Sequence, residues 1–247
     1  MKLLIDLGNS RLKWAMAESD RLTIGEPFES RPSALAAKLD QYWWDISEPQ
    51  AILVAHVGSS ETGSVLRQWL ADRWSVPVRF VRSQRAAEGV VNGYSDPARL
   101  GVDRWLALIA ARQLHPGPLC VVSAGTAVTV DLLDRHGHHH GGLIAPGLGA
   151  MRSGLGALEA LGAVAERYEG FFGRGTDAAV SSGILHATTG LVESALRQAR
   201  VLLQGEEPQL FLTGGDAAKL SAHLDVPHWL VPHLVLQGLH LIAERAS

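Results

Sequence analysis

Residues 4–10 read LIDLGNS: an apolar run that ends in an acidic residue, a glycine and two small polar residues. Glycine and asparagine between two apolar runs indicate a hairpin, so residues 2–7 predict a buried strand and residues 11–17 its return strand. Residues 121–127, VVSAGTA, repeat the same order and lead into a second return strand at 127–134. A repeat at about half the chain length indicates a duplicated domain rather than a solenoid.

Predicted strands and helices alternate along the whole chain, which is typical of an α/β fold. The segment His115-Pro116-Gly117-Pro118 is the best boundary, and it predicts domains at 1–115 and 118–247. A closing helix at 231–245 is able to return to the first domain. The other predicted strands are 51–57, 76–82, 119–123, 142–145 and 210–213, and the other predicted helices are 33–44, 62–74, 103–113, 148–162 and 177–204.

The composition of the 247-residue chain excludes several classes of protein. Apolar residues make up 47% and charged residues 19%, which excludes wholesale disorder. The formal net charge is −3, so a nucleic-acid partner is not expected. Cys120 is the only cysteine, which excludes an intrachain disulfide and favours the cytoplasm. The apolar start stops at Asp6, too short for a signal peptide, and no apolar run is long enough to span a membrane.

Common nucleotide-binding and hydrolytic motifs are absent from the sequence. None of the four lysines follows a glycine, so there is no Walker A loop, and no Gly-x-Gly-x-x-Gly occurs. No Gly-x-Ser-x-Gly or His-Glu-x-x-His motif occurs either. The two glycine hairpins remain as a cradle, because they can present backbone N–H groups to a polyphosphate. The alternative is two ordinary hairpins in a duplicated scaffold.

Five motifs, in order, resemble those of the type III pantothenate kinases, and together they span nearly the whole chain. They are Asp6-x-Gly8-Asn9-Ser10, Gly101-Val102-Asp103-Arg104, Gly125-Thr126-Ala127-x-Thr129, Gly141-Gly142-Leu143-Ile144-x-Pro146-Gly147 and Thr213-Gly214-Gly215-Asp216. The resemblance implies two actin-like, ribonuclease H-like domains with an ATP cleft between them. It also implies ATP-dependent phosphorylation of pantothenate to 4'-phosphopantothenate, the first step of coenzyme A biosynthesis, by a homodimer.

The resemblance also implies which residues bind the nucleotide. Asp6 would hold Mg²⁺ through water, since hard cations prefer oxygen ligands; the alternative is an aspartate that bonds its own turn. Lys13 would neutralise phosphate, or else be a solvated strand charge. The implied ATP-binding residues are Asp6, Leu7, Gly8, Asn9, Ser10, Arg11, Leu12, Lys13 and Thr126.

On the acceptor side, Asp103 is the predicted catalytic base, because a carboxylate beside the acceptor hydroxyl orients it and takes its proton. The alternative is a helix cap. Arg104 would clamp the carboxylate of pantothenate, or else form a surface salt bridge. Tyr94 is alternatively a loop anchor, and Thr176 a helix N-cap. The implied substrate-binding residues are Tyr94, Gly101, Val102, Asp103, Arg104 and Thr176.

Ser123 departs from the family pattern, because many members have an aspartate there that binds potassium or ammonium. A serine hydroxyl has no charge to offset desolvation of a cation. Two outcomes stay open: no monovalent-cation requirement, or a weak one met by backbone oxygens and ATP.

The histidines of residues 136–140 are expected at an exposed hairpin tip rather than around a metal. Trp43, Trp44, Trp69 and Trp74 are expected in the core or at an interface. Two rival functions stay open. One is another actin-like small-molecule kinase, and the other is a non-catalytic regulatory or accessory protein on the same fold.

Overall fold

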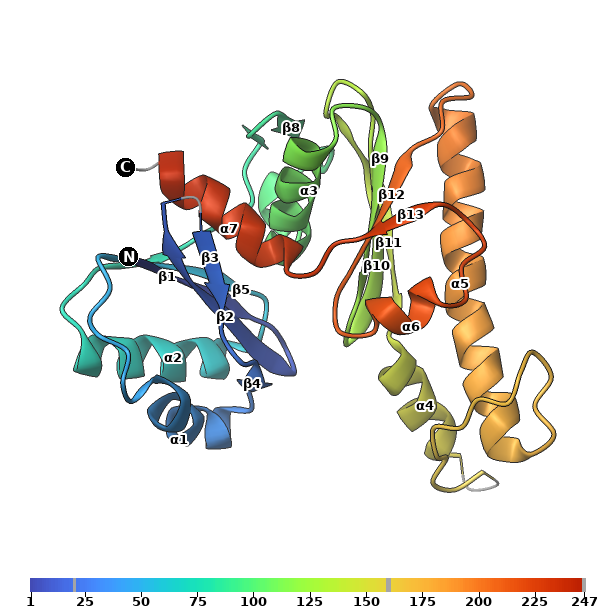
Figure 1. Ribbon diagram of the computed structural model, residues 1–247, viewed down its shortest axis with the longest axis horizontal. Coiled ribbons are helices and arrows are strands. Elements are labelled where there is room, and N and C mark those ends of the chain that lie inside the picture. Colours follow the sequence, from blue (N-terminus) through green and yellow to red (C-terminus); the bar gives the residue numbers. More distant parts are fainter. Residues whose placement is uncertain (20, 159–160, 246–247) are drawn as a thin grey trace. The chain divides into compact units, whose positions relative to one another are not determined.

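The computed structural model describes residues 1–19, 21–158 and 161–245 (Figure 1). The chain forms two compact units: unit 1 holds Met1–Gln113 and the residues from His233 on, and unit 2 holds Leu114–Pro232. The chain therefore passes between the units twice, after Gln113 and after Pro232. The domain limits expected from the sequence, 1–115 and 118–247, stay a prediction.

Unit 1 is built on a sheet with the strand order β3-β2-β1-β5-β6, in which β4 also pairs with β2. Its elements are β1 (Lys2–Leu7), β2 (Arg11–Glu18), β3 (Arg21–Ile24), β4 (Phe28–Glu29), α1 (Pro32–Trp43), β5 (Ala51–His56), α2 (Ser60–Arg73), β6 (Val78–Phe80), β7 (Ala86–Ala87), β8 (Val90–Val91), the 3₁₀ helix η1 (Pro97–Arg99), α3 (Val102–Leu114) and α7 (Leu234–Arg245).

Helices cover both faces of this sheet, with α1 and α2 on one side and α3 and α7 on the other (Figure 1). Strand β1 serves both cores, because Leu3 and Ile5 join the cluster with α1 and α2, whereas Leu4 joins the cluster with α3 and α7. A central strand with both faces covered is apolar along most of its length, as Leu3, Leu4 and Ile5 are here, which explains why residues 2–7 form so clear a sequence signal.

Unit 2 repeats this arrangement with the strand order β11-β10-β9-β12-β13. Its elements are β9 (Leu119–Ala124), β10 (Ala127–Leu133), β11 (His139–Pro146), α4 (Leu148–Gly156), α5 (Thr176–Leu202), β12 (Gln209–Thr213), α6 (Ala217–Ser221) and β13 (His228–Leu230). In both units the first strand pairs antiparallel with the second and parallel with a later one. The matching strand order confirms the duplication that the sequence repeat predicts.

Most predicted elements are present, and three of their bounds differ from the prediction by three residues or more. The closing helix begins at Leu234 rather than at 231. His233 has a φ of 60°, which is not a helical conformation, so the helix cannot extend back through it. The helix predicted for 148–162 ends at Gly156, where a Cβ would come within 3.2 Å of the Gly162 carbonyl; residues 159–160 of that prediction lie outside the described residues. Strand β11 begins at His139, within the stretch expected to be a hairpin tip.

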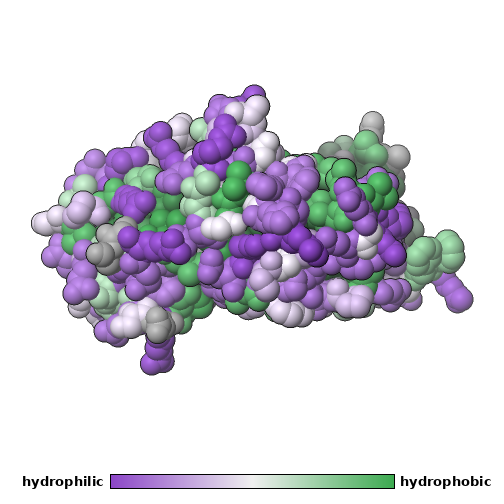
Figure 2. All heavy atoms as spheres, turned by 90° about the horizontal axis from the view of Figure 1, so that it is seen from above, coloured by the Kyte–Doolittle hydropathy of each residue, from purple (hydrophilic) through white to green (hydrophobic). Residues whose placement is uncertain are grey.

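No helix within the described ranges is long and apolar enough to cross a membrane. Figure 2 shows one face, on which polar side chains predominate and apolar side chains gather in patches between them. Trp43 and Trp74 are buried as expected, whereas Trp44 is 72% exposed and does not belong to the core.

Candidate active site

The first glycine turn joins β1 to β2 and is held from behind. The Gly8 N–H donates to the Arg11 carbonyl at 3.1 Å, and the buried Ser30 hydroxyl donates to the Gly8 carbonyl at 2.9 Å. The side chains of Asn9 and Ser10 are exposed at the tip. The turn is therefore fixed on its inner side and open on its outer side. Ser30 lies in a short irregular stretch that has no periodicity, so the sequence did not single it out.

Asp6 is a buried carboxylate at the end of β1. It is 5% exposed, and its Oδ2 atom lies 3.6 Å from Lys13 Nζ on the adjacent strand. The pKa of Asp6 is raised to about 6, because burial and the negative charge of Asp103 raise it by more than Lys13 lowers it. A buried anion with one partly exposed lysine as counter-charge is stabilised further by a divalent cation, so its oxygens fit Mg²⁺.

Three of the predicted ATP-binding residues, Leu7, Leu12 and Arg11, differ in whether their side chains are exposed. Leu7 and Leu12 pair with each other across the hairpin, and both side chains are fully buried in the core. Only their backbone groups are therefore free of the core. Arg11, between the turn and Leu12, is exposed.

The motif Gly101-Val102-Asp103-Arg104 lies at the first turn of α3. Asp103 Oδ1 accepts a hydrogen bond from the Arg104 backbone N–H at 2.8 Å. A Cβ at Gly101 would come within 2.6 Å of the same oxygen, so glycine leaves room for the carboxylate. Val102 is buried with the core residues of α3 and α7. Asp103 therefore interacts with the helix start, which the sequence left as an alternative, and also acts electrostatically on Asp6.

Arg104 and Tyr94 form a pair beside Asp103. Arg104 is 6% exposed, which rules out a surface salt bridge. Its Nη1 atom donates to the Tyr94 hydroxyl at 3.0 Å, and its guanidinium lies 5.7 Å from the centre of the tyrosine ring. The half-buried Tyr94 belongs to the segment that precedes η1. Unit 1 thus brings together Asp6, Lys13, Asp103, Arg104 and Tyr94.

The second glycine turn lies in unit 2 between β9 and β10, with Thr126 exposed at its tip. Two glycines pack against its backbone. A Cβ at Gly147 would meet the Gly125 carbonyl oxygen at 2.0 Å, and a Cβ at Gly214 would meet the Ala124 carbonyl oxygen at 2.2 Å. Gly214 also has a φ of +100°, a conformation that L side chains rarely adopt. Two separate sequence motifs therefore converge on one turn.

Two further predicted residues lie elsewhere in unit 2. Thr176 is the exposed first residue of α5, and its N-cap is Gly175, so the alternative that Thr176 is the cap is wrong. Ser123 lies in β9, half-buried, between Thr129 of β10 and Thr213 of β12. These neighbours offer uncharged hydroxyl and carbonyl oxygens.

Of the four histidines in residues 136–140, His136, His138 and His140 are exposed as expected, whereas His139 is not. His139 is 3% exposed, and its Nε2 atom lies 2.8 Å from Oδ1 of the buried Asp131. His138 and His140 lie beside Asp134; although partial burial raises the pKa of Asp134, hydrogen bonds from the segment bring it to about 2. Among the described residues, no group of three acidic, histidine or cysteine side chains is suited to hold a metal ion.

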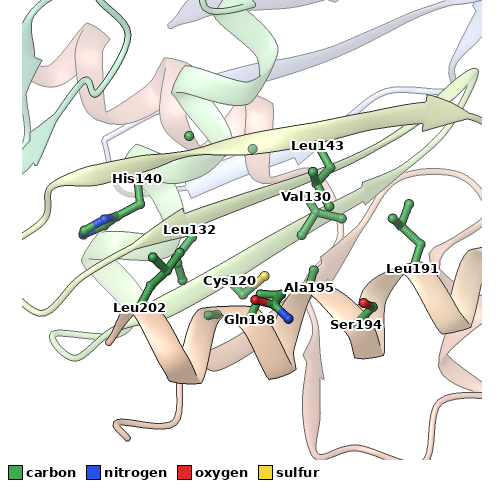
Figure 3. Close-up of a pocket in the computed structure, with 13 residues that line it drawn as sticks. Cys120, Val130, Leu132, His140, Leu143, Leu191, Ser194, Ala195, Gln198 and Leu202 are labelled. Atoms are coloured by element: carbon green, nitrogen blue, oxygen red, sulfur yellow. The ribbon is translucent and has the colours of Figure 1, made fainter. Parts of the chain in front are cut away.

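A cavity of about 290 Å³ lies in unit 2, between α5 and strands β10 and β11 (Figure 3). Its lining is mostly apolar and includes Cys120 of β9, while His140, Ser194 and Gln198 are its polar residues. Burial, together with the nearby Asp131, raises the pKa of the Cys120 thiol to about 12, so the thiol stays protonated at neutral pH. None of the predicted catalytic or ATP-binding side chains lines this cavity.

Comparison with known proteins identifies relatives along the whole chain. The family model described as type III pantothenate kinase matches residues 2–198. A type III pantothenate kinase of Laribacter hongkongensis is 39% identical over 249 residues, with all of both chains covered. A further similar structure is that of a putative Baf family transcriptional activator from Campylobacter jejuni, with a TM-score of 0.60, 21% identity and 99% and 98% of the two chains covered. A putative 2-dehydro-3-deoxygalactonokinase from Sinorhizobium meliloti has a TM-score of 0.58, 16% identity and coverage of 100% and 99%. The likeness to these two structures shows a shared fold.

Proposed function

The chain belongs to the type III pantothenate kinase family, and from that membership we propose that it transfers the γ-phosphoryl group of ATP to the terminal hydroxyl of pantothenate. The products are ADP and 4'-phosphopantothenate, the first intermediate of coenzyme A biosynthesis. The observation that carries the proposal is the juxtaposition in unit 1 of Asp103 and the buried Arg104 with Asp6 and Lys13.

We assign the acceptor to the start of α3. The Arg104 guanidinium presents a fork of N–H donors that suits the carboxylate of pantothenate, and the Tyr94 hydroxyl lies 3.0 Å from it. Asp103, the residue before Arg104, would accept the hydroxyl proton as the new P–O bond forms. Phosphoryl transfer depends mostly on positioning and charge neutralisation. Binding of the pantothenate carboxylate to Arg104 would therefore help to hold the pantothenate hydroxyl in line for transfer.

We assign the phosphates to the glycine turns. The outward side of Gly8-Asn9-Ser10 offers backbone N–H groups, and Lys13 contributes a positive charge on the next strand. Asp6 would hold Mg²⁺ through water, and when bound the ion neutralises charge that develops on the transferred phosphoryl group. Thr126 at the tip of the second turn is the proposed contact from unit 2. That ATP lies between the two units stays a prediction.

We further propose that potassium or ammonium is required only weakly. Ser123 replaces the acidic ligand common in the family, and a neutral hydroxyl does not offset cation desolvation as a carboxylate does. ATP brings its own negative charge, so backbone oxygens suffice for weak binding. Activation should therefore need high concentrations of KCl or NH₄Cl at constant ionic strength, and tight saturable activation would contradict the proposal.

We propose that the protein is a cytoplasmic homodimer. The support for a second copy is an apolar patch on unit 2, made by Leu143 of β11 and Leu202 of α5, which are 44% and 60% exposed. Both side chains line the cavity of Figure 3. Large exposed apolar patches mark interaction sites, and a two-fold interface uses the same patch on both copies. The single buried thiol, Cys120, suits a reducing compartment.

The function is tested by a coupled ADP-release assay with purified protein, MgATP and pantothenate, with pantothenate omitted as the control. We expect ADP release that depends on pantothenate, matched by an equal amount of phosphorylated pantothenate in mass spectrometry. Sugars and other small alcohols serve as rival acceptors. ADP release that is faster with one of them, or that is absent with every acceptor, would contradict the proposal.

A further inference from the structure

The segment from Gln84 to Leu100 carries Tyr94 and leads into α3, yet its regular elements, β7, β8 and η1, have only two or three residues each. Its conformation is held instead by side chains that bond its own backbone. The Ser83 hydroxyl closes the base of the segment by donating to the Leu100 carbonyl at 2.8 Å. The position of the tyrosine thus depends on a small number of named contacts.

The buried Asn92 side chain forms hydrogen bonds with the backbone of this segment. It is 2% exposed, and its Nδ2 atom donates to the carbonyls of Gln84 and Pro97, each at 3.2 Å. Its Oδ1 atom accepts the Tyr94 backbone N–H at 3.0 Å. An amide supplies two donors and one acceptor at the same time, whereas a carboxylate of the same shape supplies no donor. Asn92 therefore ties both ends of the segment to the residue that carries the tyrosine ring.

Arg85 forms hydrogen bonds with the backbone of the same segment from its exposed side. Its Nη1 atom donates to the Tyr94 carbonyl at 3.1 Å, and its Nη2 atom donates to the Ser95 carbonyl at 3.1 Å. The side chain is exposed, so it contributes little to the core. The forked guanidinium reaches two consecutive carbonyls, which a lysine ammonium does not do in the same geometry. Asn92 and Arg85 together fix the backbone of Tyr94 at its N–H and at its carbonyl.

We propose that Asn92 and Arg85 are positioning residues for the acceptor: they hold Tyr94 against Arg104 and thereby set the affinity for pantothenate rather than the rate of transfer. Arg104 belongs to the rigid helix α3, so the 3.0 Å contact between its Nη1 atom and the Tyr94 hydroxyl depends on how the segment is held. Loosening the segment separates Tyr94 from Arg104 without moving Asp103 or Asp6. This inference rests on the proposed function, because it assigns pantothenate to Arg104 and Tyr94.

The test compares Arg85→Lys and Asn92→Asp with Arg82→Lys as the matched control, since Arg82 is an exposed arginine three residues before Arg85. We expect both test variants to raise the KM for pantothenate at least about tenfold, as the loss of a hydrogen bond to a charged group does. Their kcat and their KM for ATP should stay within about twofold of wild type, and the control should match wild type throughout. Hydrogen exchange without substrate should show faster exchange at residues 93–96 in both test variants.

Arg85→Lys keeps the test decisive if Asn92→Asp does not fold, because Arg85 is exposed. An unchanged KM for pantothenate in Arg85→Lys overturns the inference, and so does a parallel loss of kcat and ATP affinity, which would mark general damage. Wild-type protein without pantothenate-dependent turnover overturns the proposed function and this inference with it. Wild-type turnover with an unchanged pantothenate KM in the variants overturns this inference alone.

Discussion

At the scale of one residue, burial of the Asp6 carboxylate favours the binding of a cation. Burial raises its pKa from 3.8 to about 6, so the ionised form is destabilised in the folded protein without a cation. An acid whose pKa is raised on folding contributes full stability below its unfolded pKa, and this contribution is lost as the pH rises through the folded value. The carboxylate therefore opposes folding above about pH 6 and favours a bound cation.

Asp6→Asn should make the folded protein more stable at pH 8 while preventing productive MgATP binding. A shift of about two pKa units corresponds to about 3 kcal/mol, which is the expected gain in the free energy of unfolding at pH 8. The gain should shrink as the pH falls from about 6 towards about 4. Urea unfolding at several pH values measures it, and a variant less stable than wild type at pH 8 would refute this account of Asp6.

The sequence predicted the residues of the turns and of the α3 start, because glycine and carboxylate signals are local in the chain. It did not predict Ser30, Arg85 or Asn92. Their partners are backbone carbonyls and N–H groups that only the folded segment brings within reach, and such contacts leave no periodic pattern. His139 was misjudged for the same reason, since only the bulged pairing of β10 with β11 brings it to Asp131.

At the scale of elements, the second glycine turn is held by close backbone approaches. Gly147 and Gly214 both contact the β9–β10 turn at distances that leave no room for a side chain. Gly215, the next residue, is exposed, and a Cβ there would have no atom of another residue within 4 Å beyond its chain neighbours. These neighbours in the sequence therefore offer a matched pair of substitutions.

Gly214→Ala should destabilise unit 2, whereas Gly215→Ala should not. An alanine at a φ of +100° is strained, and its Cβ would meet the Ala124 carbonyl oxygen at 2.2 Å. We expect a loss of about 2 kcal/mol or more in the free energy of unfolding, together with a higher KM for ATP. Urea titrations of both variants provide the comparison. Equal stability of the two would contradict this account, because it would show that the turn accommodates a side chain at residue 214.

The sequence also predicted most strands of both sheets and most of the helices, because their apolar patterns are long. It missed the shortest elements, β4, β7, β8, β13 and α6, which have five residues or fewer. It also missed β3, whose side chains are mostly exposed. Elements of this kind bury too few side chains to produce an apolar pattern.

At the scale of the whole molecule, the proposed homodimer rests on the apolar patch of Leu143 and Leu202. Leu202→Asp should dissociate the dimer into monomers, because it would bury an unpaired charge at the interface. Ile24→Asp is the control, since Ile24 is 38% exposed on β3 of unit 1. Sedimentation velocity measures the masses. A monomeric wild-type protein, or a variant that stays as dimeric as wild type, would place the interface elsewhere or exclude it.

The central claim is that unit 1 positions Asp103 as the base in ATP-dependent phosphorylation of pantothenate. Pantothenate-dependent ADP release by wild type and Asp103→Asn, at saturating concentrations of both substrates, tests it most directly. Asparagine keeps the shape and an oxygen that can accept the Arg104 N–H, so the fold and ATP affinity should be retained, as calorimetry would check. We predict that turnover falls about 10²–10⁴-fold. Turnover within about threefold of wild type would contradict the claim and leave Asp103 as a partner of the helix start alone.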